Sequence, residues 1–209
     1  HGAAGQDCGK IVPGMLMAAA RLEMPAIFLN GGPMYPASYC GRHYDGNIVT
    51  EAIGWKQQGR IDEEEFRHIE DIAEPCPGSC AMLGTANTLS ALSESLGMSL
   101  MGSSTIPAVL AARMAKGVET GEKIVELVQK GVTTRDILTE EAFENAVMHL
   151  LTMGGSTNGI LHLQAIYHEA GLGELPLSVF DEFSRKIPQV ASIYPASEFD
   201  MVDFYEGGG

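Results

Sequence analysis

The feature of this sequence that most constrains its fold is a recurring unit in which a glycine-containing turn runs directly into a helical pattern. The first turn, residues 7–14, leads into MLMAAARL, whose Ala, Leu and Met favour helix. Ser79-Cys80 leads into a predicted helix over 85–96, and residues 154–158 open another through Ala170. Such a chain places its unusual residues at helix N-termini, where α/β domains commonly bind ligands.

Further helices follow from capping residues. We predict one from Asp62 to Ala73, with Asp62 as N-cap and acidic residues in its first turn. Thr139 is the predicted cap of a helix that ends near Met153, and Ser178 with Asp181 resembles a capping box. Residues 107–130 are helical in pattern, with weak points at two glycines, Gly117 and Gly121.

Strand signals are few. Residues 25–30 form a short apolar run that stops at Gly31-Gly32-Pro33 and reads as a buried strand. Residues 35–47 are polar and read as an excursion or hairpin. We therefore expect residues 1–209 to form a single α/β domain with helices dominant, and an all-α domain is the alternative.

The charge excludes several partners. The sequence has 13 basic and 27 acidic residues, a net charge of −14, which argues against a nucleic-acid or anionic-membrane surface. No run of 18 apolar residues and no secretory leader is visible, and four cysteines are too few for a disulfide-stapled scaffold. We expect a cytoplasmic protein, or one of an organelle matrix if the source is eukaryotic.

Two cysteines are candidate metal ligands. Cys8 and Cys80 each lie in a turn before a predicted helix, where backbone N–H groups and the helix dipole favour the thiolate that binds metal. The alternative is that both are small buried apolar residues. Cys76 and Cys80 form C-x3-C rather than the C-x2-C that zinc sites prefer, and Cys40 has no partner signal.

Lys10 and the turn at 154–158 are the other candidates. Lys10 could bind phosphate or, if carbamylated, offer oxygen to a hard cation, and it could also be an ordinary surface lysine. Ser156, Thr157 and Asn158 could bind a carboxylate or phosphate at a helix start, or simply cap that helix. His162 follows one turn later and is either catalytic or a satisfied core histidine, and no nucleotide-binding glycine motif is present.

Taken together, these motifs resemble one family. Cys8-Gly9-Lys10 with IVPGMLMAAARL and the later GGPM is similar to the C-D-K-x-x-P-G-M-L-M-A-A-A-R-L…GGPM signature of the dihydroxy-acid/6-phosphogluconate dehydratase family. Ser79 to Thr88 resembles its second cysteine motif, Gly154 to Leu163 its GGSTN-x-x-L-H-L segment, and Asp203 to Gly208 its D-F-x-E-A-G-G stretch. The order and spacing agree over essentially the whole chain.

The resemblance implies a fold and a set of ligands. It implies a three-layer α/β/α sandwich, the partial N-terminal domain of a larger two-domain dehydratase whose C-terminal, β-rich domain is absent here. Cys8 and Cys80 would be two of three cysteine ligands of an iron–sulfur cluster, 2Fe–2S or 4Fe–4S, and the third would precede this sequence. Lys10 would be a carbamylated lysine that binds Mg2+. The chain departs from the family at Gly9, where the signature has an aspartate that also binds Mg2+.

The resemblance also implies a reaction. It is the dehydration of a small 2,3-dihydroxy acid to a 2-oxo acid, such as 2,3-dihydroxyisovalerate to 2-oxoisovalerate in branched-chain amino-acid biosynthesis. The cluster would act as a Lewis acid beside Mg2+, in a homodimer or homotetramer. Sugar-acid and 6-phosphogluconate dehydratases of the same family are the alternative. The 209 residues alone are expected to be an inactive fragment, with or without a cluster.

Overall fold

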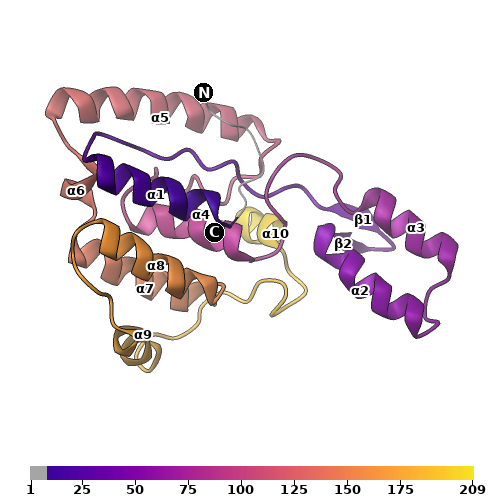
Figure 1. Cartoon of the computed structure of the whole chain (residues 1–209). Coiled ribbons are helices and arrows are strands. Elements are labelled where there is room, and N and C mark those ends of the chain that lie inside the picture. The colour runs from indigo at the N-terminus through magenta and orange to yellow at the C-terminus, as the bar shows by residue number, and fades with distance from the viewer. Residues whose placement is uncertain (1–8) are drawn as a thin grey trace.

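A computed structural model describes residues 9–209, which form a helical body and a smaller arm (Figure 1). The body contains eight helices: α1 (Ile11–Leu22), α4 (Thr85–Ser95), α5 (Ala111–Lys130), α6 (Thr134–Ile137), α7 (Glu140–Met153), α8 (Asn158–Glu169), α9 (Leu177–Ser184) and α10 (Met201–Glu206). The arm contains the antiparallel strands β1 (Ala37–Tyr39) and β2 (Arg42–Tyr44) and the helices α2 (Gly46–Gln57) and α3 (Glu63–Ile72). No described helix is long and apolar enough to cross a membrane.

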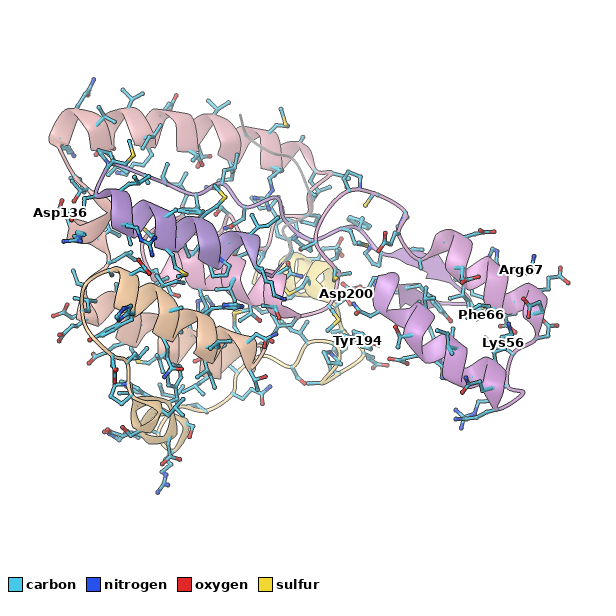
Figure 2. The ribbon with its side chains drawn as sticks, viewed as in Figure 1. Lys56, Phe66, Arg67, Asp136, Tyr194 and Asp200 are labelled. Carbon is cyan, nitrogen blue, oxygen red and sulfur yellow. The ribbon has the colours of Figure 1, made fainter. Side chains whose placement is uncertain are left out.

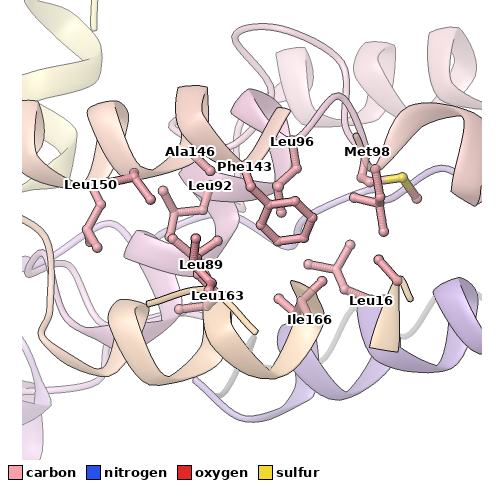
Figure 3. Packing of buried hydrophobic residues seen from close by; sticks show 14 of the residues in the cluster. Leu16, Leu89, Leu92, Leu96, Met98, Phe143, Ala146, Leu150, Leu163 and Ile166 are labelled. Atoms are coloured by element: carbon pink, nitrogen blue, oxygen red, sulfur yellow. The ribbon is translucent and has the colours of Figure 1, made fainter. Parts of the chain in front are cut away.

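The core of the body lies between α1, α4, α7 and α8 (Figure 3). Phe143 of α7 lies at its centre, 1% exposed, with its ring edge-to-face against Tyr167 of α8 at 4.9 Å between centroids. At the rim, Arg21 of α1 donates two hydrogen bonds, of 2.8 and 2.6 Å, to the Glu169 carboxylate of α8. The main buried members are Leu16, Leu89, Leu92, Leu96, Met98, Phe143, Ala146, Leu150, Leu163 and Ile166.

The arm has a hydrophobic cluster of its own. Tyr44, Ala52 and Ile69 are buried there, and Trp55 and Phe66 pack against them. None of these residues belongs to the clusters that form the core of the body. In Figure 1 the arm extends away from the helices of the body, and the chain enters it after Pro36 and leaves it after Ala73. The arm is therefore a separately packed unit.

Most of the predicted helices are confirmed. The Asp62 side chain accepts a hydrogen bond from the backbone N–H of Glu65 at the start of α3. Thr139 caps α7 through the N–H of Ala142, and α7 ends at Gly154, whose left-handed backbone suits glycine. The excursion at 35–47 contains the β1–β2 hairpin, and α5 runs through Gly117 without a break.

The predicted strand at 25–30 is reduced to one bridge. Phe28 pairs in parallel with Ser99, and a second isolated bridge joins Pro33 to Ser79. Neither extends into a ladder within residues 9–209, where the β1–β2 hairpin makes up the one sheet. The helical part of the α/β prediction holds, but the middle layer of a three-layer α/β/α sandwich is not formed by these residues.

Two local predictions differ from the structure. α9 begins at Leu177 with Pro176 as its N-cap, and no side chain caps it, so the Ser178 capping box is wrong. Proline sets the backbone angle of a helix start without a side-chain bond, which explains the earlier beginning. Helix α2 was not predicted, although the Asp45 side chain caps it through the N–H of Asn47.

A partly buried histidine makes the stability of the body depend on pH. Burial on α7 lowers the pKa of His149, and the nearby Glu94 carboxylate only partly opposes this. The unfolded chain then binds more protons than the folded one just below the ordinary histidine value of 6.5, so the free energy of unfolding should fall as the pH drops through that range. Urea unfolding of wild type and His149→Gln at several pH values tests this. The variant should lose that part of the slope, and an unchanged slope would contradict it.

Candidate functional site

A cavity of about 640 Å³ opens where the turns before α1, α4 and α8 meet. Cys80 and Thr85 line it from the turn before α4 and the start of that helix, and Gly9 lines it from the turn before α1. Ser156 and Thr157 line it from the turn before α8. The structure thus brings together three segments far apart in the sequence, each of which was predicted to carry site residues.

The start of α4 is bonded to the turn that precedes α8. The Asn158 side-chain amide donates to Thr85 Oγ1 at 2.8 Å, and Ser156 Oγ lies 3.3 Å from the same hydroxyl. The backbone N–H of Ser156 donates to Thr88 Oγ1 at 3.0 Å. Thr157 is the N-cap of α8 but makes no side-chain capping bond. The first three N–H groups of α8 already donate to oxygens of Ser156 and Thr157. The Thr157 hydroxyl and the positive end of the helix dipole can still attract an anion such as a carboxylate.

Glycine is required in this turn by close packing. A Cβ on Gly155 would lie 2.8 Å from Leu150 Cδ1 and 3.0 Å from Thr88 Cγ2. A Cβ on Gly159 would meet Leu150 at the same 2.8 Å. The glycines let α8 begin directly against α4 and so bring Ser156 and Thr157 to the cavity.

The turn that carries Cys80 is held by one amide side chain. Asn87 of α4, 2% exposed, donates to the carbonyl oxygens of Cys80 at 2.6 Å and Met82 at 2.7 Å. Its own oxygen accepts a 2.7 Å hydrogen bond from Ser79 Oγ. All three polar contacts fix the same turn, so Asn87 sets the position of the Cys80 thiol relative to the helix start.

The Cys80 thiol lies in acidic surroundings. Partial burial raises its pKa most, the Asp45 and Glu74 carboxylates raise it further, and a hydrogen bond with Asn47 opposes them. The helix dipole expected to favour the thiolate at Cys80 does not offset these effects on the thiol pKa. The reason is distance, since α4 begins five residues later, at Thr85, and the dipole acts within the first turn.

The other predicted ligands are less closely joined to the cavity. Lys10 is exposed at the N-cap of α1 and is not among the residues that line the cavity. Its charge acts on His162 of α8, whose pKa is lowered first by burial and then by Lys10. The predicted ligand Cys8 lies outside the described residues.

Position 9 has no room for a side chain. A Cβ on Gly9 would lie 2.6 Å from both Cβ and Cγ2 of Thr85. An aspartate at this position would require Thr85 or the turn to move. The departure from the family signature at Gly9 thus agrees with the packing at the start of α4.

Sequence reasoning missed three residues at this cavity. Asn47 reaches it from the start of α2 in the arm, Glu74 reaches it from the segment just after the arm, and Asn87 lies behind the Cys80 turn. Asn87 had a local signal, because an asparagine near the start of a helix commonly bonds to nearby backbone groups. Asn47 and Glu74 had none, since their place depends on how the arm meets the body.

The sequence is similar to known proteins over nearly its whole length. Residues 4–209 match the family described as dihydroxy-acid/6-phosphogluconate dehydratase N-terminal. The chain is 50% identical over 203 residues to a dihydroxy-acid dehydratase of Pyrococcus furiosus, and 48% identical to those of Pyrococcus abyssi and Halothermothrix orenii. Each alignment covers 97% of this chain and 37% of the relative, so the chain spans little more than a third of their length.

Proposed function

The chain belongs to the dihydroxy-acid/6-phosphogluconate dehydratase family, and from this we propose that it is the N-terminal part of an enzyme that dehydrates 2,3-dihydroxy carboxylic acids to 2-oxo acids. The observation that carries the proposal is the meeting of Cys80 with the starts of α1, α4 and α8 at one cavity. The relatives cited above are named dihydroxy-acid dehydratases, which favours a dihydroxy acid such as 2,3-dihydroxyisovalerate as substrate.

The described part of the site fits an iron–sulfur cluster at Cys80. Its sulfur borders a cavity of about 640 Å³, and the Asn87 bonds hold its turn in place. Carboxylates that raise the thiol pKa would be balanced by bound iron, which converts a thiol to a thiolate. Cys80 would hold the cluster together with Cys8 and a third cysteine outside this sequence. When bound, a cluster with one open iron supplies a Lewis acid for the departing hydroxyl.

The other described residues would bind and orient the acid. The N–H groups at the start of α4, with the Thr157 hydroxyl, would hold the substrate carboxylate. Thr85, bonded to Asn158, would fix the separation of the two helix starts. In the overall reaction the proton at C2 and the hydroxyl at C3 leave as water, and the enol that remains becomes the 2-oxo acid.

The expected Mg2+ site matches the described residues less well than the expected cluster site does. Lys10 is present, but Gly9 offers no carboxylate, and Thr85 occupies the space that a side chain at position 9 would need. Glu74 lines the same cavity from the segment just after the arm, at a different place in the sequence. The described residues therefore fit Mg2+ less well than they fit a cluster ligand at Cys80.

We propose that the finer architecture is completed by the rest of the protein. The parallel bridges at Phe28–Ser99 and Pro33–Ser79 would become part of the middle layer of an α/β/α sandwich. The full-length protein would be a homodimer or homotetramer, as the family resemblance implies.

The test is an assay of the full-length protein for 2-oxo acid formation, with and without Mg2+. We expect turnover of 2,3-dihydroxyisovalerate in preference to a panel of sugar acids and 6-phosphogluconate. Turnover of sugar acids alone would assign the protein to the alternative branch of the family. No turnover of any of these, from a protein with intact cluster absorbance, would contradict the proposed dehydratase activity.

A further inference from the structure

A second group of candidate ligands lies where the arm meets the body, at His43, Asp200 and Asp203. His43 is on β2, Asp200 is the N-cap of α10 and Asp203 is one turn into that helix. His43 Nδ1 lies 2.6 Å from Asp200 Oδ2 and 3.9 Å from Asp203 Oδ2, and the three ligand atoms are all within 4.8 Å of one another. Figure 2 shows Asp200 at the junction between α10 and the arm.

The two carboxylates are only partly used by the helix cap. Asp200 Oδ1 accepts the backbone N–H groups of Val202 and Asp203, at 2.8 and 3.1 Å, which leaves Oδ2 facing His43. Asp203 Oδ2 accepts the N–H of Asp200 at 2.8 Å. Asp200 is 4% exposed, and a carboxylate so buried is costly unless a positive charge balances it.

The balance of charge favours a cation at this place. A neutral imidazole with two carboxylates carries a charge of about −2, and a protonated imidazole would offset only half of it. Glu198 and Asp45 border the adjoining cavity and add further negative charge. A divalent ion would neutralise the pair Asp200 and Asp203.

There is also space for the rest of a coordination shell. A cavity of about 40 Å³ adjoins His43 and Asp200, and at roughly 10–15 Å³ for each water it has room for two or three. Ligands about 2.0–2.1 Å from a tetrahedral zinc lie about 3.3 Å apart. The observed 2.6 and 3.9 Å fall on either side of that separation, so small side-chain rotations would bring all three atoms to one ion.

We propose that His43, Asp200 and Asp203 form a binding site for a divalent transition metal, with Zn2+ the best match to one imidazole and two carboxylates. The ion would join β2 of the arm to α10 of the body. The site is separate from the Cys80 cavity and does not depend on the proposed dehydratase activity.

The test is metal binding with Zn2+ and Co2+ in a cysteine-free background, in which Cys8, Cys40, Cys76 and Cys80 are all replaced by serine, so that thiols cannot supply ligands. We expect one bound ion, a Co2+ spectrum without a sulfur-to-cobalt charge-transfer band, and a rise in Tm on adding Zn2+. Loss of a supporting second-layer residue typically weakens metal binding about 10–100-fold, so loss of a ligand in His43→Ala should weaken it by at least about 100-fold.

Two further variants keep the test specific. His68→Ala removes another exposed histidine of the arm, one that contacts Tyr39, and should leave Zn2+ affinity unchanged. Asp203→Asn should weaken binding while His43 is intact. In the cysteine-free background, equal affinity with and without His43→Ala, or no binding at all, would overturn the proposal and leave His43 and Asp200 as an ordinary ion pair.

Discussion

Cys80→Ser in the full-length protein should lose both the visible absorbance of its cluster and its dehydratase activity. A serine hydroxyl keeps the shape of the turn, which Asn87 holds through backbone carbonyls that do not change. It does not provide the soft thiolate that iron–sulfur clusters require. A metal Lewis acid lowers the activation barrier by several kcal/mol, so its loss should reduce turnover by about a thousandfold or more.

Cys40→Ser is the matched control. Cys40 is exposed in the turn between β1 and β2 and is not among the residues that line the Cys80 cavity. Its substitution should leave absorbance and turnover unchanged. Normal turnover by Cys80→Ser, or equal losses in the two variants, would show that the cavity described here does not hold the cluster.

Gly32→Ala should destabilise the body by about 3 kcal/mol. Gly32 has φ of +86°, a left-handed conformation that costs an L-residue roughly 1–2 kcal/mol. A methyl group there would also overlap the carbonyl oxygen of Ile106 and the guanidinium of Arg113, which is buried. Overpacking of this kind adds roughly 1–3 kcal/mol. For a chain of this length we expect Tm to fall by roughly 6–12 °C, measured by circular dichroism.

Gly102→Ala separates the two causes. Gly102 has a similar φ, +69°, but a Cβ there would meet nothing within 4 Å. The Gly102→Ala variant should lose only the conformational part of the free energy of unfolding, about 1 kcal/mol. Equal losses in the two variants would mean that the overlap with Ile106 and Arg113 is relieved by movement and contributes little.

Local signals in the sequence were sufficient for much of the fold. Asp62 and Thr139 cap helices because a short polar side chain bonds to N–H groups two or three residues away, and such bonds depend on neighbours in the sequence.

Residues 25–30 show the limit of predicting structure from local signals. Their apolar run is compatible with a strand, but a strand needs a partner, and only Phe28 finds one, at Ser99. Pairing over 71 positions cannot be read from a local pattern.

The candidate site shows the same contrast between local signals, which the sequence carries, and long-range contacts, which it does not. Cys80, Ser156 and Thr157 were marked by their turns, and the structure places them at one cavity. The environment of the Cys80 thiol was not predicted, because Asp45 and Asn47 come from the arm and change the balance of charge around it. Asn47 is not distinguished by the sequence, and its role follows from the docking of a separate unit.

The separate packing of the arm affects how this protein can vary. The hydrophobic cluster of the arm shares no residue with that of the body, so substitutions at Trp55 or Phe66 should have little energetic coupling to Phe143. The arm nevertheless carries Asn47, and the segment just after it carries Glu74, to one side of the Cys80 cavity. Substitutions in the arm can therefore change that side of the cavity with little effect on the stability of the helical body.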